Sequence, residues 1–234
     1  MNLTEEYWDA RYQQNNMPWQ LDDVNPLLPH FLATYKLEKD AAILVPGAGM
    51  GTEAIYLARS GFTNITVVDI AATAVSRFTA LCRTLGRSSR FRESDINKDE
   101  KLPSSSSRES AQTAAVQHDF DPNLISVLHQ DFFKHTGSYD LIWEQTFYCA
   151  LDVDLRDKYV AHMHDLLHDK QGTLAGVLFN FPLTEKGPPY GGSQSEYRNR
   201  LDPKFDVIEM APTSRSTPSR LGKELFFVAQ AKAQ

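Results

Sequence analysis

This sequence lacks the features that mark disulfide-rich, membrane-spanning, exported and nucleic-acid-binding proteins. Two cysteines among 234 residues, Cys82 and Cys149, favour a reducing compartment. No apolar run approaches the length of a membrane span, and Met1 to Glu6 are polar and acidic, unlike a signal or transit peptide. Acidic residues outnumber basic ones by 30 to 24, a net charge of −6, which disfavours nucleic acid because phosphates call for a basic face. We therefore expect a cytoplasmic protein with neither a membrane nor a nucleic acid as its partner.

A phosphate-binding loop is also missing, because no Lys-Ser or Lys-Thr follows the main glycine-rich stretch. That stretch, residues 43–53, contains three apolar residues, then a turn with Gly47, Gly49 and Gly51, then residues that favour a helix. This order predicts a buried strand, a loop and a helix. The glycines allow positive φ angles and let a ligand approach the main chain without meeting a Cβ atom. The stretch is thus a candidate ligand site.

An acidic residue follows at the end of the next apolar run. Residues 64–70 predict a second strand, in which Asp69 lies 20 positions after Gly49. A carboxylate there can accept hydrogen bonds from both hydroxyls of a ribose. A dinucleotide fingerprint would have its third glycine where Thr52 stands, so the pattern favours S-adenosylmethionine, which has a ribose but no pyrophosphate. A dinucleotide is the second interpretation. A third is a purely structural turn that binds no ligand, but it does not explain why Asp69 stands where a ribose would lie.

The rest of the chain predicts an α/β protein. Apolar runs indicate further strands at 124–129, 139–144, 172–181, 205–210 and 224–229. Apolar strands that alternate with helices indicate a parallel sheet, whose ligands bind at the carboxyl ends of the strands. Four suitable residues fall at that edge: Gly47, Asp69, Asp131 and Glu144. A loop alone joins the last two strands, which predicts an antiparallel pair on an otherwise parallel sheet.

We expect one domain over residues 1–234. Two of its segments differ from the rest in composition. Residues 1–36 carry aromatic side chains on predicted short helices. They form either an arm packed on the core or a lid, because aromatic faces hold a sulfonium cation and water must be kept from it. Residues 88–123 are rich in serine and charge and poor in apolar residues, the composition of a flexible surface insertion.

Three histidines on a predicted helix over 152–168 invite a metal interpretation. They are His162, His164 and His168, and the last two are four positions apart. No carboxylate accompanies them in a metalloprotease pattern, and a polar helix face is the commoner explanation. We expect no metal.

Eight segments spread over the chain form a wider pattern, at 6–12, 17–19, 45–49, 131–133, 139–142, 147–151, 155–156 and 187–190. In order and spacing they resemble the thiopurine S-methyltransferase family, most closely its thiol and halide or thiocyanate methyltransferase branch. The resemblance covers nearly the whole chain except the serine-rich insertion. It implies a class I S-adenosylmethionine-dependent methyltransferase with a Rossmann-like fold, in which the last strand of a mostly parallel seven-stranded sheet is antiparallel. S-adenosylhomocysteine would be the product, and we expect a monomer.

The resemblance also implies which residues hold the cofactor. Trp8 and the glycine loop would contact its methionine part. Asp69 would contact the ribose, and Gln130 with Asp131 the adenine. The full set of expected cofactor-binding residues is Trp8, Trp19, Gly47, Ala48, Gly49, Asp69, Ile70, Gln130, Asp131, Phe132 and Glu144.

The acceptor site is implied in the same way, by the set Trp19, Phe147, Arg156 and Tyr190. Methyl transfer from a sulfonium is an in-line displacement, so the protein chiefly aligns the acceptor and excludes water. A thiol with a pKa of about 8.5 is mostly protonated at neutral pH. Our hypothesis is that Arg156 lowers that pKa and that Glu144 or Asp152 takes the proton. Cys149 is expected to be a small buried side chain beside the pocket and not a nucleophile.

The expected activity is methyl transfer to a small-molecule thiol. A second hypothesis keeps the fold and takes a halide, thiocyanate or hydrosulfide ion, or an oxygen or nitrogen of a secondary metabolite. A third is a protein that binds the cofactor without catalysis. Pocket size separates the first two, because an inorganic anion needs a closed positive cavity and an organic thiol an open aromatic one.

Overall fold

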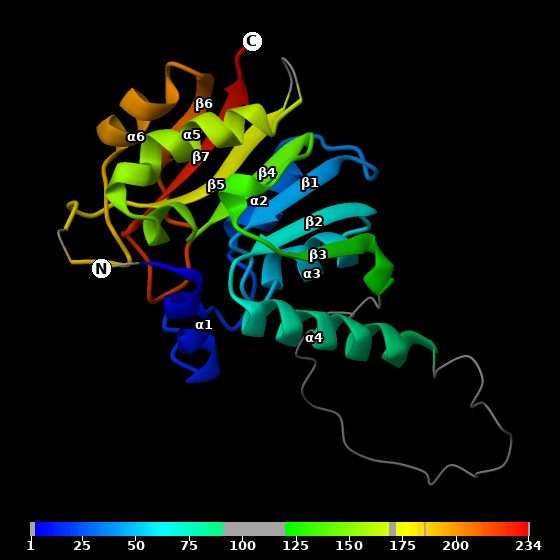
Figure 1. The fold of residues 1–234 in the computed structure, drawn as a ribbon. Helices are drawn as coiled ribbons and strands as arrows, with labels where there is room; N and C mark the ends of the chain where they lie inside the picture. The colour runs from blue at the N-terminus through cyan, green and yellow to red at the C-terminus, as the bar shows by residue number, and fades with distance from the viewer. Residues whose placement is uncertain (1–2, 91–119, 169–171, 185, 234) are drawn as a thin grey trace, which may run out of the picture.

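The computed structural model describes residues 3–90, 120–168, 172–184 and 186–233. Its centre is a seven-stranded sheet with strand order β3-β2-β1-β4-β5-β7-β6 (Figure 1). The first five strands are parallel, whereas β7 is antiparallel to both β5 and β6. The predicted sheet is thereby confirmed. Its strands are β1 (Ala42–Pro46), β2 (Asn64–Asp69), β3 (Ile125–His129), β4 (Leu141–Gln145), β5 (Thr173–Phe179), β6 (Phe205–Pro212) and β7 (Glu224–Ala231).

Helices connect the strands and cover both faces of the sheet. They are α1 (Glu5–Gln13), α2 (Leu27–Thr34), α3 (Thr52–Arg59), α4 (Ala72–Arg90), α5 (Arg156–Asp165) and α6 (Gln194–Leu201). Short 3-10 turns add η1 (Pro122–Leu124), η2 (Phe132–Lys134), η3 (Tyr148–Ala150) and η4 (Val153–Leu155). Across the described stretches, no helix combines the length and apolar character that crossing a membrane requires.

The expected strands differ from the observed ones by one or two residues at their ends, and two helical segments differ more. The helix over 152–168 is shorter, because the turn η4 precedes α5. Helix α4 runs through Gly86 to Arg90, so residues 88–90 of the expected insertion are helical. Glycine lowers helix stability by about 1 kcal/mol relative to alanine but does not forbid a helix. Residues 91–119, most of that insertion, lie outside the described residues.

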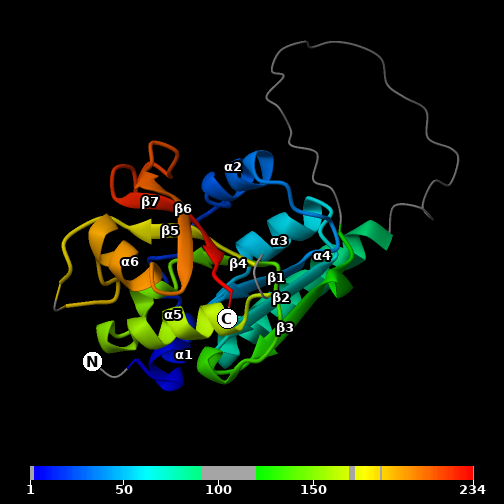
Figure 2. The same cartoon turned by 90° about the horizontal axis from the view of Figure 1, so that it is seen from above.

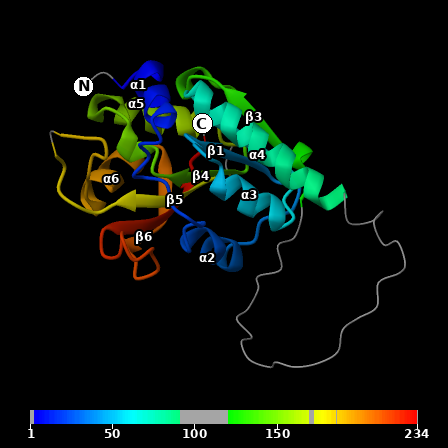
Figure 3. The ribbon, with the colours of Figure 1, turned by 90° about the horizontal axis from the view of Figure 1, so that it is seen from below.

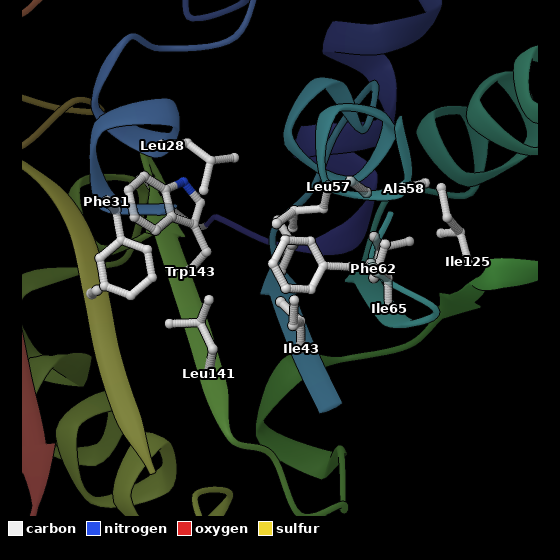
Figure 4. Close-up of a cluster of buried hydrophobic side chains, with 14 of the residues drawn as sticks. Leu28, Phe31, Ile43, Leu57, Ala58, Phe62, Ile65, Ile125, Leu141 and Trp143 are labelled. Atoms are coloured by element: carbon white, nitrogen blue, oxygen red, sulfur yellow. The ribbon is translucent and has the colours of Figure 1, made fainter. Parts of the chain in front are cut away.

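The hydrophobic core has two halves, one on each face of the sheet. Along β1, Ile43 and Val45 join the half under α2, α3 and α4, whereas Leu44 joins the half under α5 and α6. This alternation is the two-residue period of a strand covered on both faces. Figures 2 and 3 show α2 and α3 on one side of the sheet and α5 and α6 on the other. In the first half, Phe31 packs on Trp143, with ring centroids 5.6 Å apart (Figure 4).

Candidate active site

The glycine loop after β1 has the conformation that the sequence predicts. Gly47 has a φ of 59° and Gly49 a φ of 54°, in the left-handed region that favours glycine. A Cβ atom on Gly47 would lie 2.5 Å from Cδ2 of Phe147, and one on Gly49 would lie 2.7 Å from the hydroxyl of Tyr12. The loop therefore runs between two aromatic side chains with no room for a larger residue.

Asp69 lies at the carboxyl end of β2, beside this loop. One carboxylate oxygen accepts from the backbone N–H of Gly49 and the other from that of Ala71, both at 2.8 Å. Burial raises the pKa of Asp69, and the hydrogen bonds from Ala71 and Gly49 oppose that shift. The carboxylate is thus held in one orientation and keeps acceptor capacity for a ligand, because each oxygen has a second lone pair.

A cavity of about 400 Å³ opens at the carboxyl ends of the parallel strands. Its volume lies in the range of small-molecule sites. Nine of the expected binding residues line it: Trp8, Trp19, Gly47, Asp69, Ile70, Gln130, Asp131, Phe132 and Phe147. The structure thus brings together side chains from the amino-terminal arm and from the ends of four strands.

The loop after β3 forms the wall beside β2. The carboxylate of Asp131 accepts from the backbone N–H of Phe133 at 2.9 Å. The side-chain oxygen of Gln130 lies 3.2 Å from Nδ1 of His135, and its amide nitrogen donates to the carbonyl of Lys134. Sequence reasoning missed His135, which is buried and whose other ring nitrogen lies 2.7 Å from the hydroxyl of Tyr139. This network fixes Gln130 at the cavity wall.

The amino-terminal arm closes the cavity on its other side. The ring centroid of Trp19 lies 5.5 Å from that of Trp8 and 5.8 Å from that of Tyr12, in edge-on contacts. Asp9 accepts from the backbone N–H of Thr73 at 2.6 Å, which ties α1 to the start of α4. The arm therefore packs on the core and lines the cavity at once.

Among the described residues, two arginines line the cavity, and neither was expected as a site residue. Arg220, in the loop between β6 and β7, donates to the carbonyl of Trp19 and lies 3.3 Å from the carboxylate of Glu224. The guanidinium of Arg11 lies 5.1 Å from the ring centroid of Trp19. Two guanidinium groups thus lie beside Trp19, one of which is paired with the carboxylate of Glu224. The residues around Arg220 carry no recognisable pattern, so packing alone brings it here.

The side chains of Arg156, Asp152 and Tyr190 lie outside the lining of the cavity. Arg156 is fully buried; its guanidinium donates to the carbonyl of Gly191 at 2.9 Å and lies 3.3 Å from the carboxylate of Glu196. The hydroxyl of Tyr190 donates to Asp152 at 3.4 Å. The three side chains lie within the described stretches but do not line the cavity. They support the segment 187–192, whose prolines do line it. The catalytic roles expected for Arg156 and Asp152 and the acceptor-binding roles expected for Arg156 and Tyr190 stay predictions.

Glu144 is fully buried beneath the cavity wall. One carboxylate oxygen accepts from the backbone N–H groups of Phe147 and Tyr148, at 2.8 and 2.9 Å, and the other accepts from the hydroxyl of Tyr159. Burial raises its pKa to about 7, against the hydrogen bonds of Tyr159, Tyr148 and Phe147. Glu144 thus holds the turn that carries Phe147, and it does not itself line the cavity.

Cys149 lines the cavity, and its thiol donates to the carbonyl of Thr146 at 3.3 Å. Burial raises the pKa of this thiol, which keeps it protonated and weakly nucleophilic. Its position agrees with the expected small side chain beside the pocket.

His162 and His164 of α5, and His168 beyond its end, each have a separate partner. His162 lies 2.8 Å from the carbonyl of Phe132, and His164 lies 3.0 Å from that of Lys232. His168 lies 2.8 Å from the hydroxyl of Ser138. Across the described stretches, no three histidine, cysteine, aspartate or glutamate side chains gather as a metal site would need.

Comparison with solved structures shows the class of this fold. The chain superimposes on 1,6-didemethyltoxoflavin-N1-methyltransferase of Burkholderia thailandensis, solved with S-adenosylhomocysteine, with a TM-score of 0.67 and 16% identity over 97% of this chain and 87% of that one. It also superimposes on a methyltransferase from Aquifex aeolicus, with a TM-score of 0.60 and 15% identity over 95% and 98% of the two chains. With the glycine loop and Asp69 in place, the fold is that of a class I S-adenosylmethionine-dependent methyltransferase.

The family follows from the sequence comparison. The model of the thiopurine S-methyltransferase family matches residues 3–229, and the chain belongs to that family. Probable thiol methyltransferase 2 of Arabidopsis thaliana is 28% identical over 93% of this chain and 81% of its own length. Thiopurine S-methyltransferase of Vibrio parahaemolyticus is 28% identical over 80% and 76%. Thiocyanate methyltransferase 1 of Arabidopsis thaliana is 25% identical over 93% and 81%.

Proposed function

We propose that this methyltransferase transfers the methyl group of S-adenosylmethionine to the sulfur of a small organic thiol. The observation that carries the proposal is the division of the cavity into two chemically different parts. Asp69 and Asp131 lie at the ends of β2 and β3. Around Trp19, the wall is aromatic and apolar, with Arg220 and Arg11 as its charges.

The first part suits the cofactor, which supplies an activated methyl group as a sulfonium when it is bound. Asp69 is positioned to accept from ribose hydroxyls, because two backbone N–H groups fix its carboxylate. Gln130 and Asp131 are positioned to hold the adenine, with Phe132 as an apolar surface beside it. The positive φ of Gly47 lets the backbone border the cavity directly.

The second part suits a thiolate. A thiol has a pKa of about 8.5, and a nearby positive charge lowers it by favouring the anion. Arg220 is well placed for this, because the carbonyl of Trp19 and the carboxylate of Glu224 fix its guanidinium at the cavity wall. Apolar groups such as Leu151 and Pro189 also line the cavity, and they would exclude water from the transfer.

The roles expected for Arg156, Glu144 and Asp152 are proposed in a modified form. Asp152 accepts from the hydroxyl of Tyr190, so it would position that side chain. Arg156 holds the carbonyl of Gly191, so it would position the wall formed by Pro188 and Pro189. Glu144 would position Phe147 through the turn that it holds. Since the anion itself is the nucleophile, no base on the protein has to remove the proton in the transfer step.

An inorganic anion is the second candidate acceptor. One relative is named a thiocyanate methyltransferase, and Arg11 and Arg220 supply the positive charge that such an ion needs. The wall around Trp19 is largely aromatic and apolar, which favours an organic thiol. We further propose that the protein acts as a monomer in the cytoplasm, as the sequence predicts.

The test measures S-adenosylhomocysteine formation from S-adenosylmethionine with aliphatic and aromatic thiols, iodide and thiocyanate. We expect turnover with thiols. The Arg220→Met variant should lose most of this turnover rate but keep its affinity for S-adenosylhomocysteine. Arg220→Lys, which keeps the charge and an ion-pair donor for Glu224, should recover part of the rate. Lys223→Met serves as the control, because Lys223 lies on the same loop and is exposed. Turnover with iodide alone would favour the second candidate, and none with any acceptor would contradict the proposal.

A further inference from the structure

The arginine that the loop between β6 and β7 brings to the cavity is paired with a buried carboxylate. Glu224, the first residue of β7, is 1% exposed, and one of its oxygens lies 3.3 Å from the guanidinium of Arg220. Taking two charges out of water costs free energy, and replacing such a pair by apolar side chains is often neutral or even stabilising. Stability alone therefore does not explain an ion pair at this position.

The second oxygen of Glu224 accepts from two uncharged side chains. The hydroxyl of Ser216 donates to it from the same loop, and the amide nitrogen of Asn25 donates to it at 3.4 Å from the segment before α2. Asn25 is fully buried, and its own amide oxygen accepts from the backbone N–H of Leu27 at 3.1 Å. One donor on the loop and one on the amino-terminal arm thus hold the carboxylate.

The guanidinium of Arg220 is held on further sides by the arm and by β5. One of its nitrogens donates to the carbonyl of Trp19 at 2.5 Å, and its centre lies 5.5 Å from the ring centroid of Phe179. A guanidinium carries five N–H donors in a rigid planar fork. Within the described stretches, it donates to Glu224 and Trp19. These contacts orient the fork and leave donors for a group in the cavity that Arg220 lines.

We propose that Ser216 and Asn25 are positioning residues of the acceptor site, which act through Glu224 to aim the guanidinium of Arg220 at the acceptor sulfur. Neither residue lines the cavity, so neither touches the acceptor. Their effect is steep because the attraction between two charges and the strength of a hydrogen bond both depend on distance, and a misplacement of about 1 Å can cost a large part of a rate. The inference rests on the proposed function, because it takes Arg220 as the charge that stabilises the thiolate.

Ser216 allows the position of Arg220 to be changed without a change of charge. Besides Glu224, the charge of Arg220 acts on the titratable side chains of Glu53 on α3 and Cys149 on the turn η3. Replacing Ser216 by alanine leaves all of these groups in place, whereas a variant of Glu224 would alter the charge at the site as well as its geometry. Ser216 is half-buried, so its hydroxyl can be removed without a large cavity in the core.

The test measures the rate of methyl transfer to saturating 2-mercaptoethanol in a single turnover, over a range of pH. A single turnover separates the transfer step from product release, and its pH dependence reports groups in the complex with bound thiol. A guanidinium aimed at the sulfur lowers the pKa of that thiol. Ser216→Ala removes the donor to Glu224, and Ser216→Thr keeps a hydroxyl. Ser219→Ala is the matched control, because Ser219 is exposed on the same loop.

We expect Ser216→Ala to raise the pKa of the bound thiol by about one unit, which lowers the rate at neutral pH about tenfold, while S-adenosylhomocysteine affinity changes less than twofold and shows that the variant is folded. Ser216→Thr should recover most of the rate, and Ser219→Ala should match the wild-type protein. Asn25→Ala, which removes the other donor, should shift the profile in the same direction.

A rate that is unchanged, or lowered equally at every pH, in both Ser216→Ala and Asn25→Ala would overturn the inference while the proposed function stands. A wild-type protein that forms no S-methyl product with any thiol would overturn both.

Discussion

Replacing Glu144 by glutamine should change how the stability of the protein depends on pH. Burial raises the pKa of Glu144 from its ordinary value of 4.5 to about 7. Between these values the folded protein binds more protons than the unfolded chain, so the free energy of unfolding falls as pH rises. Each pKa unit corresponds to about 1.4 kcal/mol, and the loss contributed by Glu144 is therefore about 3 kcal/mol. This loss of unfolding free energy is complete above pH 7 and absent below pH 4.5.

Glutamine keeps the local contacts and removes the titration. Its side-chain oxygen can accept from Phe147 and Tyr148 as the carboxylate does, and its amide nitrogen can donate to the hydroxyl of Tyr159. Between pH 5 and pH 8, we expect the variant to gain about 3 kcal/mol relative to the wild-type protein.

Urea unfolding at several pH values measures this difference. Glu38→Gln is the control, because Glu38 is exposed; its profile should run parallel to that of the wild-type protein. Parallel profiles for Glu144→Gln and the wild-type protein would refute the reasoning, since they would mean that the buried carboxyl is ionised throughout.

Three further predictions follow from the site. Gly47→Ala should lower the free energy of unfolding by about 1–3 kcal/mol, measured in urea, and weaken cofactor binding, because the residue has a φ of 59° and its Cβ would meet Phe147. Arg156→Ala should cost about 3 kcal/mol, since it leaves the carbonyl of Gly191 without its donor and removes a large, fully buried side chain; thermal unfolding should show a smaller loss for Arg156→Lys. His135→Ala should weaken S-adenosylhomocysteine binding about fivefold in calorimetry, because one hydrogen bond that fixes Gln130 is lost.

Much of the fold could be predicted because its signals are local. Each apolar run is long enough for one strand, and the glycines at 47 and 49 have no substitute in the tight loop. The position of Asp69 follows from the same regularity, since a strand that ends 20 residues after Gly49 returns to the same edge of the sheet. The side of the cavity that we propose for the cofactor could therefore be predicted from the sequence.

The acceptor side depends on contacts between distant segments. Arg220 reaches the cavity by donating to Trp19, a residue 201 positions earlier. Conversely, Arg156 lies at the expected place in the chain, but Tyr148 and Glu196 enclose its guanidinium. No local pattern distinguishes an arginine that faces a cavity from one that packs beneath its wall. The pairing of Gln130 with His135 is closer in sequence, yet it needs the backbone of the turn η2 to bring the two together.

The central claim is that the acceptor atom is sulfur, and the product shows this most directly. The protein is incubated with S-adenosylmethionine whose methyl group carries deuterium and with 4-mercaptophenol, which offers a thiol and a hydroxyl in one molecule. Fragmentation of the product in a mass spectrometer then locates the label. The account predicts deuterated methyl on sulfur, at a rate that Arg220→Met strongly reduces and Lys223→Met leaves unchanged. Label on oxygen, or no labelled product from this and other thiols despite bound cofactor, would contradict it.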